Sequence, residues 1–268
     1  MSDTVIEATK PASKSRQLLQ VVITTTGLLL LWQLVVTLSD TPAFILPAPL
    51  QVIKTLFSQP AYLLRHAGVT LIEILAGLTL GCVLGLLSAL IMTAFQGVRR
   101  WVFPVLVISQ AIPVFALAPL LTLWLGYGMA SKIAMATLII YFPVTAAAFD
   151  GLRHTTSDWL DIAHVMQAGR LSVIRHIRLP AALPSIASGI RVATSVAPIG
   201  AVIGEWVGSS QGLGFVMLNA NGRMQTDMMF AALFVLAILA ITLYWLVNRC
   251  LDALLFWQID STRSQQLS

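Results

Sequence analysis

The chain has 268 residues, of which 57% are hydrophobic and only 10% are charged. Soluble domains carry about 25% charged residues, so this composition excludes both a soluble globular protein and a disordered one. The formal net charge is +5. We infer no nucleic-acid partner from it, because the basic residues follow the membrane topology described below.

Apolar runs long enough to cross a bilayer, about 20 residues each, divide the chain. The runs are too long and too continuous for barrel strands, so the predicted fold class is an all-α, polytopic membrane protein. A polar tail at 1–17 and another at 258–268 flank a transmembrane domain at 18–257. The first run is too long for a signal peptide and has no convincing cleavage site. We expect six transmembrane helices, near residues 18–38, 67–95, 101–125, 131–149, 185–206 and 228–249.

The distribution of Lys and Arg predicts the orientation. With six spans both termini lie on one side, and twelve of the 16 basic residues fall on that side. Basic residues are retained in the cytoplasm. We therefore expect a bacterial cytoplasmic (inner) membrane protein with both termini and the loop 150–184 in the cytoplasm. The four basic residues on the other side are Lys54, Arg65, Lys132 and Arg223.

The first outer segment, residues 39–66, contains Pro47 and Pro49 and then apolar residues at a loose helical spacing. It fits a short helix at the membrane surface or a loop packed on the outer ends of the spans, and the sequence leaves both open.

Small residues follow one face of the second span. Gly77, Gly81 and Gly85 are four residues apart, so they lie on one stripe. Small residues let two membrane helices approach closely. We expect this stripe to be a packing face, within the chain or against a second copy.

Prolines and charges mark the later spans. Pro113 and Pro119 fall in the third span and Pro198 falls in the fifth, where proline removes a backbone hydrogen bond and kinks the helix. Such kinks suit a translocation path and also suit an irregular, rigid bundle. Charges inside a membrane are costly, so Arg191 and Glu205 are further candidates for a solute path, with structural ion pairs as the alternative. Glu73 could pair with Arg65 or Arg223.

The loop 150–184 is unusually long and basic. Ser157–Asp158 predicts a helix start, with Asp158 as a possible cap. Trp159, Ile162, Ala163 and Met166 then give one apolar face. A second short helix is expected from Leu171 to Arg178, ended by Pro180. An apolar face on a helix outside the membrane must bury itself against the bundle or against a partner.

The same loop resembles the cytoplasmic signature of permease subunits of ATP-binding-cassette importers, EAA-x3-G-x9-I-x-L-P. The chain gives Asp161-Ile162-Ala163 and Gln167, and then Ile177, Leu179 and Pro180 at the expected spacing. Gln167 replaces the family's glycine, and Gly169 two residues later suggests a shifted turn. Further segments, such as Pro180–Pro184 and Trp124–Gly128, extend the resemblance over residues 18–257, toward the nitrate, sulfonate, taurine and pyrimidine-precursor branch.

The resemblance implies a type I permease fold. It also implies three kinds of partner: cytoplasmic ATP-binding subunits, an extracytoplasmic solute-binding protein and a second permease copy. Because the ATP-binding subunits would hydrolyse ATP, we expect that the chain is not itself an enzyme. The implied solute belongs to the thiamine pyrimidine precursor (hydroxymethylpyrimidine), sulfonate, taurine or nitrate class. The chain lacks the phosphate loop G-x-x-x-x-G-K-[ST], which independently places ATP chemistry elsewhere. We expect no cofactor, metal or disulfide, and the alternative function is a stand-alone secondary transporter or channel. The implied ATPase-docking residues are Trp159, Asp161, Ile162, Ala163, Met166, Gln167, Gly169, Ile177, Leu179 and Pro180.

Overall fold

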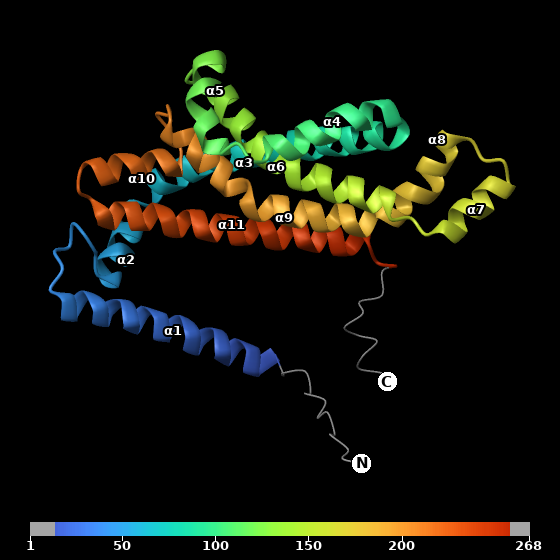
Figure 1. Ribbon diagram of the computed structural model, residues 1–268. Coiled ribbons are helices and arrows are strands. Elements are labelled where there is room, and N and C mark those ends of the chain that lie inside the picture. The colour runs from blue at the N-terminus through green and yellow to red at the C-terminus, as the bar shows by residue number, and fades with distance from the viewer. Residues whose placement is uncertain (1–13, 258–268) are drawn as a thin grey trace, which may run out of the picture.

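A computed structural model describes residues 14–257 (Figure 1). Residues 1–13 and 258–268, which make up most of the two predicted tails, lie outside the described residues. From 14 to 257 the regular elements are all helical, so the predicted all-α class is confirmed. The longer helices are α1 (Lys14–Ser39), α3 (Pro60–Ala94), α4 (Gln96–Ser109), α6 (Met129–Arg153), α9 (Leu179–Trp206) and α11 (Thr226–Leu254). The shorter ones are α2 (Pro49–Ser58), η1 (Val114–Leu117), α5 (Ala118–Leu125), α7 (Ser157–Val165), α8 (Arg170–Val173), η2 (Ile174–Arg178) and α10 (Leu213–Gly222).

Five of the six predicted spans are single helices within the described residues. The helices α1, α3, α6, α9 and α11 are each long and apolar enough to cross a membrane. The third predicted span, 101–125, is not one straight helix, because α4 and the segment η1–α5 meet at an angle of 95°. The break falls at Gln110–Pro113. Pro113 has no N–H to continue the helix, and its ring pushes the preceding residue out of helical geometry.

Helix α6 forms the centre of the bundle, between α3 and α9. On α3 the three stripe glycines face α6, where added Cβ atoms would touch Ala136, Ile140 and Val144. Gly200 of α9 faces the same Ala136 from the other side. The absence of side chains lets the three backbones approach closely, which is the main route to helix association in lipid. Of the two alternatives for the glycine stripe, the structure shows contact within the chain.

The register of these contacts gives the path of the chain through the bundle. Residue numbers rise together along α3 and α6 but run in opposite directions along α6 and α9, where Gly200 meets Ala136 and Gly204 meets Lys132. Helices α3 and α6 are therefore parallel, so the broken segment α4–η1–α5 between them must cross from one end to the other. With this bent pair counted as one span, the described residues contain six segments long and apolar enough to cross a membrane. We call the two ends the α7 end and the α10 end (Figure 1).

Two helices lie at the edge of the bundle. Helix α2 begins at Pro49, which is already restrained to helical φ, and packs on α11 through Val52 and Thr55. The Thr55 hydroxyl donates a 2.7 Å hydrogen bond to Asp227. Of the two alternatives that the sequence left open for residues 39–66, the structure shows a short helix, packed on the end of the bundle. Helix α1 lies apart from the bundle (Figure 1) and exposes many large apolar side chains, although its Trp32 ring packs against Phe230 and Phe234 of α11.

Candidate functional site

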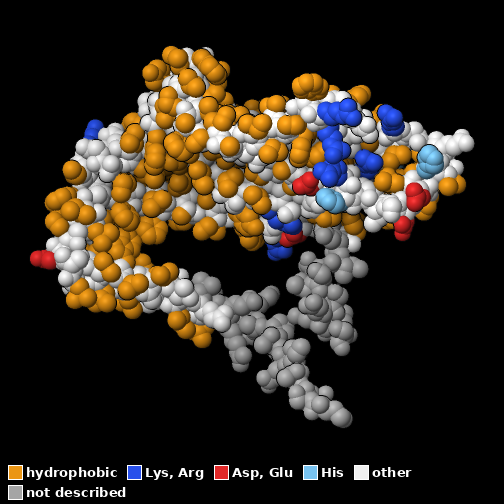
Figure 2. All heavy atoms as spheres, viewed as in Figure 1, with side chains coloured by type: hydrophobic (Ala, Val, Ile, Leu, Met, Phe, Trp, Pro, Cys, Tyr) orange, Lys and Arg blue, Asp and Glu red, His pale blue; other side chains and the backbone are white. Residues whose placement is uncertain are grey.

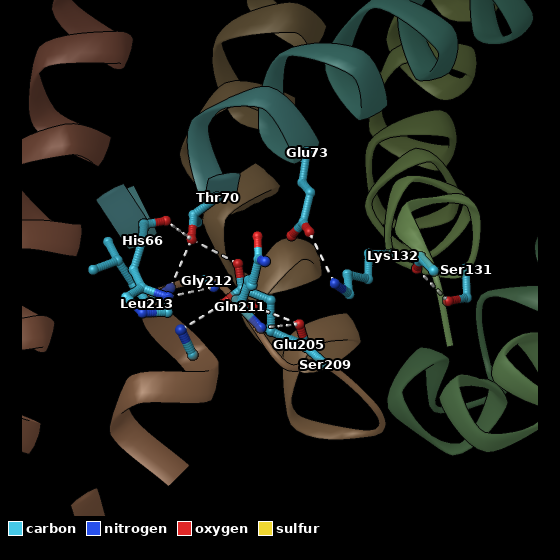
Figure 3. A network of polar contacts seen from close by, with 12 residues as sticks. His66, Thr70, Glu73, Ser131, Lys132, Glu205, Ser209, Gln211, Gly212 and Leu213 are labelled. Atoms are coloured by element: carbon cyan, nitrogen blue, oxygen red, sulfur yellow. Dashed lines mark hydrogen bonds and ion pairs between the residues drawn. The ribbon is translucent and has the colours of Figure 1, made fainter. Parts of the chain in front are cut away.

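Buried polar residues gather at the α10 end of the bundle (Figure 3). The carboxylate of Glu205, on α9, is only 1% exposed. It accepts a 2.6 Å hydrogen bond from the Thr70 hydroxyl of α3 and another from the backbone N–H of Gly214. Thr70 in turn accepts a 2.8 Å bond from the N–H of Leu213. The side chains of α3 and α9 therefore bind the free N–H groups that begin α10, where a negative charge is favoured by the helix dipole.

His66 completes the anchor of α10. Its Nδ1 accepts a 3.0 Å hydrogen bond from the backbone N–H of Gly212, so this ring nitrogen carries no proton. Gly212 has φ +105°, a conformation that favours glycine, and an added Cβ would overlap the Glu205 carboxylate. The turn into α10 thus depends on glycine for both backbone geometry and space.

A second charged contact lies beside this anchor. Lys132 Nζ, at the start of α6, is 3.4 Å from Glu73 Oε1 of α3, and both side chains are buried. We expected Glu73 to pair with Arg65 or Arg223, and this prediction was wrong. Sequence reasoning placed Lys132 at the end of a span and missed it as a partner, because nothing in the sequence shows that α3 and α6 are parallel neighbours.

One signal could have revealed the network. His66, Thr70 and Glu73 extend the stripe of Gly77 and Gly81 toward the start of α3 at helical spacing. A polar run that continues a packing stripe predicts buried polar contacts between the same helices. The network joins α3, α6, α9 and α10 through hydrogen bonds and one ion pair, which makes it a brace. Within residues 14–257 no three His, Cys, Asp or Glu side chains form a group that could hold a metal ion.

Arg191 lies on α9 toward the α7 end, far from Glu205. Its Nε donates a 2.6 Å hydrogen bond to Asn248, and its guanidinium pairs with Asp252 at 2.7 Å. These contacts fasten α9 to α11. Because Glu205 and Arg191 are both bonded to neighbours in the chain, their part in a solute path stays a prediction.

The prolines of the candidate path fall into two groups. Pro198 is buried inside α9. Pro113 and Pro119 stand on either side of η1, at the start of the two short helical pieces after the break. The residues 110–113 at the break are exposed on the surface of the single chain. In lipid, non-helical backbone is tolerated only where it is covered by protein or lines a water-filled cavity.

The predicted apolar helix of the loop is α7. Trp159, Ile162 and Met166 form an exposed apolar face. Ala163 does not belong to that surface, because it is 3% exposed and buried within the chain. Asp158 does not cap the helix as expected, since it is the second helical residue and Thr156 occupies the capping position without a side-chain bond. Asp161 is exposed.

The turn after α7 falls at Gln167 itself. Gln167 has φ +52°, whereas Gly169 has an ordinary φ of −64°, so the expected shift of the turn by two residues was wrong. The N–H of Ala168 bonds to the Ala163 carbonyl and that of Gln167 to the His164 carbonyl, each at 2.9 Å. This is the Schellman arrangement, in which the left-handed residue is usually glycine. The glycine that the family signature has at the position of Gln167 is therefore explained by the left-handed backbone conformation of this turn.

The expected end at Pro180 was also wrong, because the helix continues through it. Helix α8, the π-helical segment η2 and α9 follow one another without a gap from Arg170 to Trp206. Ile177 lies in η2, and Leu179 and Pro180 begin α9. A π-turn changes the local hydrogen-bond pattern, which accommodates a proline that lacks its own N–H. The loop is thus joined to the membrane bundle by one continuous helical rod.

These features define a class of protein: a polytopic membrane protein with a bent, partly exposed span and a helical lever outside the bundle. Residues 81–258 match the family described as binding-protein-dependent transport system inner membrane component. The chain belongs to this family, the permease subunits of ABC importers, and so to the multi-pass proteins of bacterial inner membranes.

Relatives agree with this assignment, and a solved structure agrees with the fold. A "probable ABC transporter permease protein" of Haemophilus influenzae is 55% identical over 83% of this chain and 92% of its own length. The formylaminopyrimidine transport permease protein ThiX of Halalkalibacterium halodurans is 34% identical (86% and 92% covered), and the riboflavin transport system permease protein RibX of Chloroflexus aurantiacus is 35% identical (86% and 87%). In fold, the chain is similar to a chain of the MetNI methionine ABC transporter in inward-facing conformations, with TM-score 0.64, 20% identity, and 73% and 98% covered.

Proposed function

We propose that this chain forms, together with a second copy, the translocation path of an ATP-driven importer for a small nitrogen heterocycle of the thiamine pyrimidine precursor class. An extracytoplasmic binding protein delivers the solute. Separate ATPase subunits dock on the loop 150–184, which lies in the cytoplasm with both polar tails. The sulfonate, taurine and nitrate classes are the competing solutes.

The exposed break at Gln110–Pro113 is the observation that carries the proposal. The break lies within a membrane span, where lipid cannot satisfy free backbone groups. It is exposed in the single chain, so in the membrane it must face another protein or water. A second copy with a watery path between the two chains supplies both.

The shape of the loop supports ATPase docking. The apolar face of Trp159, Ile162 and Met166 is exposed at the α7 end, where none of the described residues 14–257 covers it. The rod α8–η2–α9 leads from this loop to the central pair α6 and α9. Only the hydrogen-bonded turn at residues 166–169 separates α7 from this continuous helix, so a push on α7 has a short path to the bundle.

Similarity and side-chain chemistry support the solute class. ThiX is named for formylaminopyrimidine transport and RibX for riboflavin transport, and both solutes are flat nitrogen heterocycles. Phe115, Trp124 and Tyr127 are exposed on and beside α5, next to the break. Aromatic side chains stack on heteroaromatic rings, typically with about 1–3 kcal/mol per ring, whereas sulfonate or nitrate would call for cationic groups.

Uptake into proteoliposomes tests the proposal. The chain is reconstituted with the ATPase subunits and the binding protein of its transport system, and the uptake of labelled formylaminopyrimidine is followed. We expect accumulation that requires ATP and the binding protein and survives an ionophore that collapses ion gradients. Uptake by the permease alone, driven by an ion gradient, would support a secondary transporter instead. Competition by excess riboflavin, taurine or nitrate distinguishes the solute classes.

A further inference from the structure

A group of arginines at the α7 end forms no ion pair with the described carboxylates. Figure 2 shows the basic side chains concentrated there, over the start of α4 and the rod. The ion pairs among the described side chains are Lys132–Glu73 and Arg191–Asp252, so the arginines of this group form none. Asp150 lies one turn before Arg153 on α6 but pairs with none of them. The patch consists of Arg99, Arg100, Arg153, Arg170 and Arg178.

Some of these charges already have a structural role. The guanidinium groups of Arg99 and Arg153 lie over the ring of Phe149, at 5.4 and 5.7 Å from its centroid. This cation–π contact holds two like charges close together. The electrostatic potentials of two nearby like charges add, so the surface beside them is more positive and attracts anions.

The patch contains a crevice of about 240 Å³ between the α3–α4 turn and the rod. Thr93 and Gln96 line one wall, and Arg170 and Arg178 line the other. The Nε of Arg178 is buried and has no hydrogen-bond partner. A buried donor without a partner costs about 1–3 kcal/mol. Positive charges that only set the membrane topology would stay fully in water, whereas Arg178 is half-buried and its Nε has no partner, so the crevice that it lines is suited to a hydrogen-bond acceptor.

Neighbouring aromatic residues indicate at which level of the membrane the crevice lies. Phe95 and Trp101 flank the segment Gln96–Arg100, and both are exposed, Trp101 at 82%. Exposed tryptophan on a membrane protein is typical of the boundary between hydrocarbon and headgroups. Gln96 lines the crevice and also an adjoining hollow of about 330 Å³ formed with Arg99 and Arg100. The basic surface thus lies at headgroup level.

We propose that this crevice binds the phosphate headgroup of an anionic phospholipid of the inner leaflet. Arg170 and Arg178 contact the phosphate, and Arg99 and Arg100 supply the surrounding potential. The bound headgroup bridges the α3–α4 turn and the rod that carries α7. The choice of leaflet rests on the orientation given under the proposed function, whereas the binding itself does not require transport.

Lipid retention by the full-length chain tests this site. The protein is purified in detergent and mixed with phosphatidylglycerol or phosphatidylcholine of the same acyl chains, and bound lipid is counted by native mass spectrometry. We expect preferential retention of phosphatidylglycerol. One basic residue near an anionic membrane contributes about 1 kcal/mol, or about fivefold in affinity. Arg170→Gln and Arg178→Gln should each lower this retention about fivefold.

Two matched variants make the test specific. Arg178→Lys keeps the charge and should retain the lipid. Arg223→Gln removes an exposed arginine at the α10 end and should change nothing. Equal retention of the two lipids by the wild type, or an equal loss in Arg223→Gln, would overturn the proposal.

Competition with inorganic phosphate distinguishes a lipid headgroup from a free anion as the ligand of the crevice. Inorganic phosphate that displaces phosphatidylglycerol at equal concentration would identify a site for free anions and reject the lipid. Because retention is measured without ATPase or solute, a failed uptake assay leaves this result standing, and a failed retention assay leaves the proposed function standing.

Discussion

Lys132 Nζ of α6 lies 3.4 Å from Glu73 Oε1 of α3, and this buried pair joins two parallel helices next to the anchor of α10. We expect Lys132→Met to lower the free energy of unfolding by about 3–5 kcal/mol, because it leaves an uncompensated charge inside the bundle. The measurement is the thermal unfolding midpoint of the purified chain.

The double variant Glu73→Leu/Lys132→Met removes both charges and should recover most of the loss. Lys54→Met, at an exposed position near the same end, is the matched control. If Lys132→Met unfolds at the same temperature as Lys54→Met, the pair contributes nothing to stability.

Gly81 should not tolerate a side chain. A Cβ there would lie 2.5 Å from Ile140 Cγ2, so Gly81→Leu forces α3 away from α6 and costs about 1–3 kcal/mol or more. Gly68, on the same helix, has no atoms near its Cβ position, and Gly68→Leu is the control. The yield of monodisperse protein and the uptake of solute are compared. Equal behaviour of the two variants would contradict the close contact.

Gln167→Gly should stabilise the turn after α7. Gln167 is held at φ +52°, and relief of a left-handed conformation is worth about 1 kcal/mol. Gln167→Val should destabilise the turn, since a β-branched side chain fits this conformation worst. Amide hydrogen exchange of residues 157–169 reports the effect. Ala168→Gly, one residue on at negative φ, controls for glycine flexibility, and faster exchange in Gln167→Gly than in the wild type would refute the turn.

Ile162→Glu should block ATPase docking without unfolding the loop. Ile162 is exposed on the apolar face of α7, so a charge there is harmless until a partner buries it. We expect loss of ATPase co-purification with an unchanged unfolding midpoint. Ala163→Asp should instead disturb the loop itself, because Ala163 is already buried.

His164→Glu serves as the control for charge on α7, since His164 is exposed on the opposite face of the helix. Full ATPase binding by Ile162→Glu would show that this face is not the docking surface.

The orientation can be read by thiol labelling. Cys82 and Cys250 are free and are first replaced by serine. A single cysteine is then placed at Ser210, in the exposed turn before α10, or at Ser172, exposed on α8. A membrane-impermeant reagent added outside whole cells should label Ser210→Cys and should reach Ser172→Cys only after lysis. The reverse pattern would invert the topology and the ATPase proposal with it.

The sequence by itself determined which segments are long and apolar enough to enter the membrane, and that the loop 150–184 contains a helix with an apolar face. Apolar length decides insertion because burying backbone in lipid demands long helices. Helical spacing identified the stripe of Gly77, Gly81 and Gly85, and the loop signature pointed to the family. These are local properties, and each can be read within a window of about 20 to 30 residues.

Only the tertiary structure decided which helices meet and how the chain bends between them. The parallel contact of α3 and α6 selects Lys132 as the partner of Glu73, and it requires the bent span at Gln110–Pro113 to cross the bundle. Packing buries Ala163 although its helical position matches exposed neighbours, and the closing bonds of α7 hold Gln167 at positive φ. Such contacts join residues far apart in sequence, and their energies depend on neighbours that local spacing does not specify.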